Sequence, residues 1–135
     1  MPADAGSLEA ANQAFYDAFE ALELDAMDTL WDHGDDVWCV HPGSEVISGW
    51  DRVHRSWAAV FANASYLQFI VTDVTATVAG EVGCVTCTEN ILSGHGDAAG
   101  LGAGKAVATN VFVWRGERWR MLGHHASPVV RSFTS

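Results

Sequence analysis

The sequence predicts an α+β fold in which three N-terminal helices pack on a strongly curved, mostly antiparallel sheet. Apolar residues recur at helical spacing in three segments before residue 63, and the segments after it are rich in valine, threonine and aromatic residues, as strands are. The helical segments precede most strands and do not alternate with them, which favours α+β over α/β. The 135 residues are enough for one domain with its own core.

Two helices are predicted near the N-terminus. The segment 8–22 carries an apolar stripe, and Ser7 stands where an N-cap is expected. Asp25 can cap a short second helix over 26–32. Together they supply two apolar helix faces for the sheet.

The third helix is predicted over 50–62, after a first short strand over 37–40. Ser48, with Asp51 three residues later, resembles a capping box, and the apolar residues of this segment form one stripe. The remaining strands are predicted from their β-rich composition at 66–79, 82–93, 105–115 and 118–126.

Two tight turns set the register of the predicted hairpins. Gly80 and Gly116 each stand first in a two-residue loop, as a type II′ turn requires. Counting outward from Gly116 predicts the opposed pairs Trp114 with Trp119, Phe112 with Met121, Asn110 with Gly123, and Ala108 with His125.

This register gives the last hairpin two different faces. One face is aromatic and is predicted to line the interior. The other is too apolar for a purely solvated surface, which indicates a partner, most simply a second copy of the chain. The residues expected in this homodimer interface are Thr109, Val111, Val113, Leu122 and His124.

The earlier hairpin places a carboxyl group on the core side. Counting from Gly80 sets Thr72 opposite Glu89, Ile70 opposite Ile91 and Val74 opposite Cys87, and this face is the more apolar one. Glu89 is therefore expected to point inward, unless a β-bulge reverses the phase of this long hairpin.

The domain is expected to occupy residues 8–130, with a disordered or loosely attached segment 1–7 and a C-terminal tail 131–135. The glycine-rich stretch 93–104 is long for a hairpin loop. It is interpreted either as a lid or as a tolerated surface insertion.

Charge and composition exclude several classes of partner. The net charge of −10 opposes binding to nucleic acid and to anionic membranes, and no apolar run is long enough to span a bilayer. Residues 1–20 contain no Lys or Arg, unlike a signal peptide, so we expect a cytoplasmic protein. Three cysteines, an odd number, favour free buried thiols over a disulfide framework.

Four motifs carry a resemblance to a known family. They are Trp38-Cys39-Val40-His41-Pro42-Gly43, Ser56-Trp57, Val85-Thr86-Cys87-Thr88-Glu89-Asn90-Ile91 and His124-His125-Ala126-Ser127-Pro128. With them the chain resembles the SnoaL-like branch of the nuclear-transport-factor-2-like superfamily. The resemblance implies a cone-shaped half-barrel with an internal pocket and an outer sheet face that often forms a dimer. Members include cyclases, isomerases and dehydratases, and others that only bind or assemble, so the resemblance implies a fold more than a function.

The predicted catalytic residues are Glu89, Asn110 and His125, all expected to face the interior of the cone. An apolar pocket raises a carboxyl pKa and lowers an imidazole pKa, which brings both toward the range of general acid–base catalysis. Glu89 is then a base, and Asn110 or His125 donates to the developing oxyanion. The alternative is that Glu89 and His125 only pair within the sheet.

The remaining predicted site residues contact a ligand. His41 lies at a strand end from which it can overhang the pocket, or it is an ordinary turn residue. The residues expected to line the cavity are Trp31, Trp38, Trp57, Phe112, Trp114, Trp119 and Met121.

No metal and no cofactor is expected, because adjacent His124 and His125 point to opposite faces of a strand and no nucleotide-binding motif is present. The sequence thus predicts binding of a small hydrophobic molecule, with isomerase, cyclase or lyase chemistry. The alternative is a non-catalytic dimeric binding or assembly domain.

Overall fold

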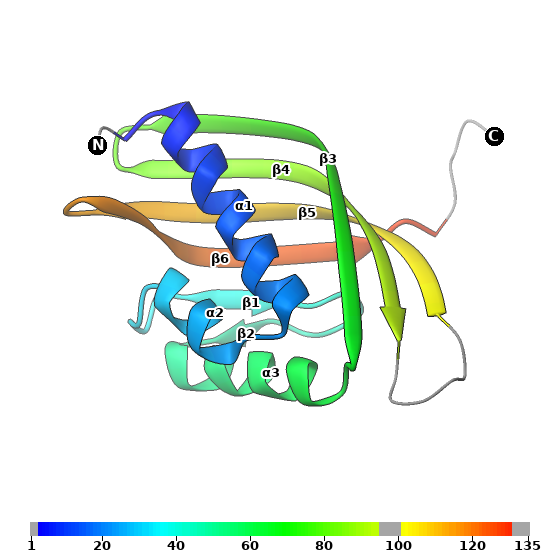
Figure 1. Ribbon diagram of the computed structural model, residues 1–135. Coiled ribbons are helices and arrows are strands. Elements are labelled where there is room, and N and C mark those ends of the chain that lie inside the picture. Colours follow the sequence, from blue (N-terminus) through cyan, green and yellow to red (C-terminus); the bar gives the residue numbers. More distant parts are fainter. Residues whose placement is uncertain (1–2, 95–100, 131–135) are drawn as a thin grey trace.

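The computed structural model describes residues 3–94 and 101–130 of the chain. Three helices pack on one six-stranded sheet, as predicted (Figure 1). The helices are α1 (Ala5–Ala21), α2 (Leu24–Leu30) and α3 (Trp50–Ala62). The strands are β1 (Trp38–Val40), β2 (Ile47–Ser48), β3 (Tyr66–Ala79), β4 (Val82–Gly94), β5 (Leu101–Arg115) and β6 (Arg118–Pro128).

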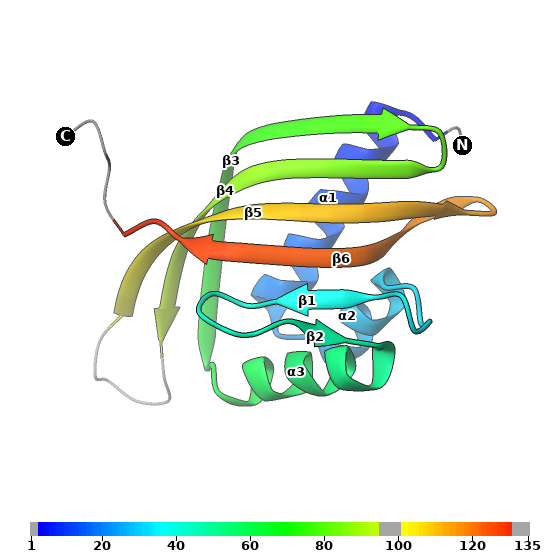
Figure 2. The same ribbon diagram turned by 180° about the vertical axis from the view of Figure 1, so that it is seen from behind.

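The sheet is mixed, open and curved. Its strand order is β2-β1-β6-β5-β4-β3, with β1 parallel to β6 and every other neighbouring pair antiparallel. Helix α1 crosses the concave face, while β3, β4 and β5 bend toward the end where α3 lies (Figures 1 and 2). The helices and the bent strands together form a cone.

The helix starts differ from the predicted ones. Asp4, not Ser7, is the N-cap of α1, and Ser7 completes a capping box with it. The predicted domain start at residue 8 therefore falls inside a helix. Helix α2 begins at Leu24 after Glu23, so Asp25 lies in its first turn. Helix α3 has the predicted bounds, but its N-cap is Gly49, and no side chain caps it.

The strands extend further than predicted. Strand β5 begins at Leu101, so it contains the last four residues of the predicted loop 93–104. Residues 95–100, on which the predicted lid rests, lie outside the described part of the chain, as does the tail 131–135. The sequence signal also missed β2, a strand of 2 residues.

Both predicted turns are present, but each hairpin contains a bulge. Gly80 and Gly116 have φ of 62° and 68°, and the residue after each has negative φ, as in a type II′ turn. The β3–β4 register shifts between Thr72 and Thr75, and the residue after Thr72, Asp73, has φ of 55°. The β5–β6 register shifts between Val111 and Phe112. Beyond each bulge the predicted pairing is wrong by one residue.

The core lies between the concave face of the sheet and the helices. Phe15 of α1 and Trp57 of α3 contact edge-on, with ring centroids 5.6 Å apart, and both are fully buried. Trp31 lies 6.2 Å from Trp57, which extends this aromatic cluster toward α2. Burying such large rings supplies much of the hydrophobic stabilisation of a small domain.

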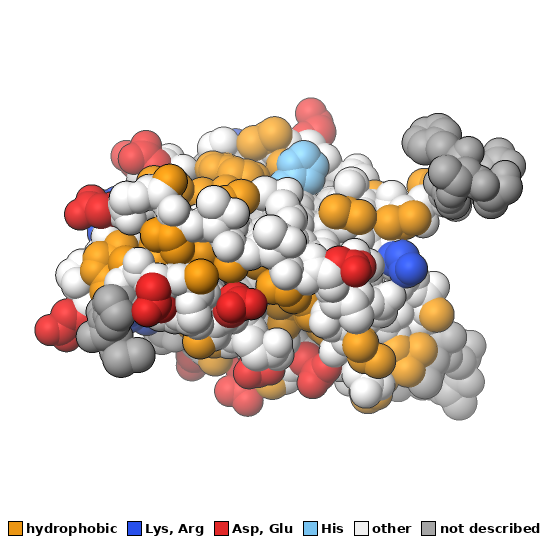
Figure 3. Space-filling view, turned by 90° about the horizontal axis from the view of Figure 1, so that it is seen from above, with side chains coloured by type: hydrophobic (Ala, Val, Ile, Leu, Met, Phe, Trp, Pro, Cys, Tyr) orange, Lys and Arg blue, Asp and Glu red, His pale blue; other side chains and the backbone are white. Residues whose placement is uncertain are grey.

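Acidic residues outnumber basic ones by 17 to 7, which gives the net charge of −10. Seen from the side of β3 and the start of α1, acidic side chains are spread over the molecule and basic ones are sparse (Figure 3). None of the helices within residues 3–94 and 101–130 has the length and apolar character needed to cross a membrane.

Candidate functional site

The bulge in β6 exchanges the roles predicted for two adjacent histidines. Val111 lies opposite Gly123 and Phe112 opposite Met121, so Leu122 is the extra residue of β6. As a result His124 points inward and is 1% exposed, while His125 is exposed. The prediction that His125 faces the interior is therefore wrong, and so is the placement of His124 in an outer interface.

Glu89 points inward as predicted, although its partner is not the predicted one. It lies opposite Val71 of β3, because the bulge is in β3 and leaves the alternation of β4 intact. The carboxyl group is 2% exposed and accepts a hydrogen bond of 2.6 Å from the Tyr16 hydroxyl of α1. Cys87 Sγ lies 3.4 Å from the same hydroxyl oxygen. Helix α1 thus brings a phenol to the predicted acid–base residue.

Asn110 joins this pair to His124. Its side-chain nitrogen donates to Tyr16 Oη at 3.2 Å and to Asn12 Oδ1 at 2.8 Å. Its side-chain oxygen lies 2.6 Å from His124 Nδ1. Asn110 is 0% exposed, and the other groups in this network are nearly as buried. A continuous polar network therefore crosses the core from β6 to β4.

Burial determines the protonation of this network. Loss of hydration raises the pKa of Glu89 above its ordinary value, and the Tyr16 hydroxyl partly offsets that rise. Burial lowers the pKa of His124 to about 3, with smaller contributions from His41 and His125. Burial and the neighbouring Glu89 raise the pKa of Tyr16. At neutral pH His124 is thus a neutral imidazole and Tyr16 a neutral phenol.

His41 lies on the α3 side of the interior and is not part of this network. Its Nε2 atom lies 3.0 Å from Ser56 Oγ, and its ring meets Trp57 edge-on at 4.8 Å. Burial lowers its pKa. The ring centroid is 6.3 Å from that of His124, too far for a hydrogen bond. His41 therefore anchors the end of β1 to α3.

The aromatic residues predicted to line a cavity mostly fill the interior. Trp31, Trp57 and Met121 are 0% exposed, while Phe112 is 1% and Trp119 5% exposed. Trp114 is half-buried against Trp119, with ring centroids 5.2 Å apart.

Trp38 departs most from its predicted place. Cys39 is buried on the inner side of β1, so the alternation of the strand puts Trp38 on the opposite face. Its indole ring lies over Gly123 there.

An apolar hollow is present at the wide end of the cone, where the bent strands meet α3. Its volume is about 450 Å³, within the size range of small-molecule sites. Phe19 and Phe69 form its inner wall, with ring centroids 4.5 Å apart. Phe69 in turn packs 5.4 Å from Tyr16. The other lining residues are Ala59, Val60, Asn63, Ala64, Leu67, Ile91 and Ser93.

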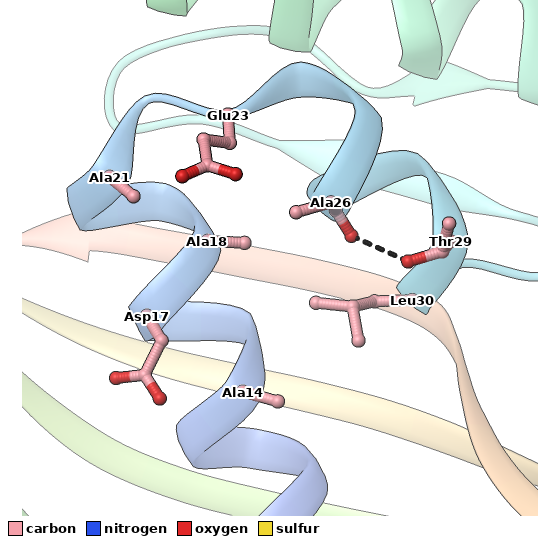
Figure 4. A pocket seen from close by; sticks show the side chains of 8 residues that line it. All are labelled: Ala14, Asp17, Ala18, Ala21, Glu23, Ala26, Thr29 and Leu30. Atoms are coloured by element: carbon pink, nitrogen blue, oxygen red, sulfur yellow. Dashed lines mark hydrogen bonds between the residues drawn. The ribbon is translucent and has the colours of Figure 1, made fainter.

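A second hollow of about 430 Å³ lies between α1 and α2 (Figure 4). Ala18, Ala26 and Leu30 face it, and the carboxylates of Asp17 and Glu23 lie on one side of it (Figure 4). The Thr29 hydroxyl donates to the Ala26 carbonyl within α2. None of its lining residues belongs to the buried polar network, so this hollow is a weaker candidate for chemistry than the wide end of the cone.

Sequence reasoning missed two members of the network, Asn12 and Tyr16. Their signal was present, because they are four residues apart and lie on the buried face of α1 with Leu8 and Phe15. Polar groups on an apolar stripe need partners in the core. The hollow had no such signal, because its residues come from several separate elements.

Within residues 3–94 and 101–130, no three His, Cys, Asp or Glu side chains are grouped as a metal site. The cysteines of this part of the chain are free thiols. The network itself offers a carboxyl, a phenol, two amides and an imidazole as groups for chemistry.

The sequence of this chain is similar to that of a plant protein. F-box protein SKIP8 of Arabidopsis thaliana is 29% identical over 116 residues, which are 86% of this chain and 47% of that protein. The chain thus spans about half the length of this curated relative.

Two solved structures are similar over nearly the whole chain. One is a proposed dehydratase of the NTF2-like family from Streptomyces avermitilis, 43% identical, with a TM-score of 0.88, covering 95% of this chain and 97% of the other. The other is a proposed calcium/calmodulin-dependent protein kinase type II association domain from Thiobacillus denitrificans, 34% identical, with a TM-score of 0.77, covering 90% and 94%. The model of the SnoaL-like domain matches residues 8–131, and the chain therefore belongs to the SnoaL-like family within the NTF2-like superfamily.

Proposed function

We propose that this protein binds a small, uncharged hydrophobic molecule at the wide end of the cone and that Glu89 exchanges a proton with it. The observation that carries the proposal is the position of Glu89 on the same face of β4 as Ile91, which lines the hollow. Among the described residues no charged side chain lines the hollow, so a charged ligand would lose its hydration there without gaining a partner.

Access to Glu89 requires one movement. Phe69 separates the hollow from Tyr16, and Tyr16 holds the carboxyl group. Phe69 is half-buried at the start of β3, so its ring can turn without breaking the core around Trp57. A ligand that displaces this ring would bring its reacting carbon to Glu89.

The chemistry then needs no cofactor. Glu89 takes a proton from a carbon next to a carbonyl group of the ligand, and the electron pair moves to the carbonyl oxygen. Return of the proton to another carbon is an isomerisation, and its transfer to a departing hydroxyl group is a dehydration. The similar Streptomyces avermitilis structure carries a dehydratase assignment, which supports this class.

Binding is tested with N-phenyl-1-naphthylamine, an uncharged apolar fluorophore. Ala59→Phe places a ring over the hollow and is expected to weaken binding at least about tenfold, roughly 1.4 kcal/mol. Ala62→Phe is the matched control, since Ala62 is also exposed on α3 but does not line the hollow. Absence of fluorophore binding by the native protein, or equal loss in both variants, contradicts the proposal.

A second proposal is that the outer sheet face joins two copies of the chain. Strands β4, β5 and β6 contain a single carboxylate, the inward-facing Glu89, in a chain with net charge −10. Val82 and Val107 are 45% and 47% exposed on this face. An apolar surface cleared of acidic side chains lets two acidic molecules approach. The similar Thiobacillus denitrificans structure carries an association-domain assignment, which supports assembly.

Sedimentation velocity tests this interface. Val107→Glu is expected to weaken dimerisation at least about thirtyfold, roughly 2 kcal/mol, because it brings carboxylates into an apolar contact. Val46→Glu is the control, since Val46 is 63% exposed in the segment between β1 and β2. A native monomer, or a dimer that persists in the Val107 variant, contradicts the interface. Among the predicted interface residues, His124 is buried and is no longer part of this proposal.

A further inference from the structure

The buried network runs from His124 to the carboxyl group of Glu89. His124 Nδ1 lies 2.6 Å from Asn110 Oδ1, Asn110 Nδ2 donates to Tyr16 Oη, and Tyr16 donates to Glu89 Oε2. The last two hydrogen bonds are therefore both donated toward β4. His124 and Glu89, the ionisable residues at its two ends, are not in direct contact.

The tautomer of His124 follows from the amide of Asn110. Both hydrogens of the Asn110 amide are used, by Asn12 Oδ1 and by Tyr16 Oη. The Asn110 oxygen must then face His124, at 2.6 Å, and only an N–H on Nδ1 can fill that contact. Since burial lowers the pKa of His124 and keeps it neutral, this ring has one N–H, and it lies on Nδ1.

The opposite arrangement of these hydrogen bonds is also chemically consistent, but it removes a hydrogen bond from Glu89. If the proton of His124 were on Nε2, the Asn110 amide would turn and donate to the bare Nδ1 atom. The Asn12 amide would turn with it, so that its nitrogen donates to the Asn110 oxygen. The Asn110 oxygen would then face Tyr16 and accept the phenol hydrogen. Glu89 would lose the hydrogen bond that favours its ionised form. The imidazole thus selects between two states of the carboxyl group.

We infer that His124 is a positioning residue, whose Nδ1–H fixes the Asn110 amide so that Tyr16 donates to Glu89. The inference rests on the proposed function, because acid–base catalysis requires a carboxylate that is ready to accept a proton. His124 itself touches no ligand in this scheme. Its effect passes through two uncharged side chains, Asn110 and Tyr16.

The other titratable groups around the two ends are few. Tyr16 from α1 and Cys87 from β4 face Glu89, while its neighbours on β3 and β5, Val71 and Ala106, are apolar.

Around His124, Cys39 of β1 lies opposite in the sheet and the ring of His41, just after β1, lies 6.3 Å away. His125 follows in β6 with its side chain exposed. Because burial lowers the pKa of both His41 and His124, their neutral rings place no fixed charge next to the network at neutral pH.

Carbon-13 NMR of the Glu89 carboxyl group tests the inference without any ligand. His124→Phe keeps a ring against Phe15 and Trp57 but removes the donor to Asn110. We expect the titration midpoint of Glu89 to rise by about one pH unit, a tenfold change in its ionisation constant. His124→Gln retains an N–H donor and is expected to restore most of the native midpoint.

His125→Phe is the matched control, because it makes the same replacement one residue along at an exposed position. An unchanged Glu89 midpoint in His124→Phe, or an equal shift in both phenylalanine variants, overturns the inference. Nitrogen-15 NMR of native His124 gives a second answer even where a variant does not fold. A proton on Nδ1 supports the inference and a proton on Nε2 overturns it. Neither measurement depends on ligand binding, so failure of the proposed function is seen separately in the fluorophore experiment.

Discussion

Glu89→Gln is expected to make the protein more stable at neutral pH, by about 1–2 kcal/mol. The glutamine oxygen can still accept the Tyr16 hydrogen bond, while the desolvated carboxylate is gone. A buried ionisable group that costs stability and fills no structural need is the pattern of a functional site. Urea unfolding of the two proteins at pH 8 measures the difference.

The pH dependence of this difference has a definite sign. Burial raises the pKa of Glu89 in the folded state above its value in the unfolded chain. Below the unfolded pKa of about 4.3 both states are protonated, and the carboxyl group has no ionisation cost. As pH rises above about 4.3, the carboxyl group ionises in the unfolded chain but stays protonated in the folded one, so the native protein loses stability until pH passes the raised folded pKa. The advantage of Glu89→Gln should therefore be small near pH 4 and grow toward pH 8.

Glu45→Gln is the control for this experiment, because Glu45 is exposed between β1 and β2. Its unfolding free energy should follow that of the native protein at both pH values. Destabilisation by Glu89→Gln at pH 8 would show that the carboxylate is a structural partner of Tyr16. The acid–base proposal would then lose its main support.

The fold could be predicted because its signals are local. The stripe of α3, the strand compositions and the two glycine turns are each contained in a short segment, and each has its predicted place in the structure. Strand β2 carries no such signal, since its pairing with β1 depends on the chain between Val40 and Ile47 returning antiparallel. Two residues are too few for periodicity to register.

The candidate site was predicted in part, and the limit is the bulge at Leu122. Glu89 and Asn110 lie on strands whose own alternation is unbroken between the turn and the site, so their inward direction could be read by counting. His124 lies beyond the extra residue, where counting by two gives the wrong face. A bulge depends on packing between strands, so it cannot be predicted from the sequence of one strand.

Gly123→Ala is expected to destabilise the protein by about 3 kcal/mol or more, lowering Tm by roughly 10 °C. Gly123 adjoins the bulge, and the Trp38 indole of β1 lies directly over its Cα. A methyl group there overlaps three atoms of the indole ring. The ring is rigid, and β1 is a strand of 3 residues held between β2 and β6, so relief requires β1 to separate from β6.

Gly104→Ala is the matched control, because a Cβ at Gly104 of β5 meets nothing within 4 Å. That variant should unfold within about 0.5 kcal/mol of the native protein. Trp38→Leu removes the overlapping ring, so in a double-mutant cycle Gly123→Ala should cost far less in the Trp38→Leu background than in the native one. A full cost in both backgrounds would mean that the loss comes from the backbone at the bulge and not from the indole. Recovery in the double variant would show that glycine is needed at this position because the Trp38 ring packs over it. That packing holds β1 on the sheet, and β1 in turn positions the inward-facing Cys39 and the adjoining His41.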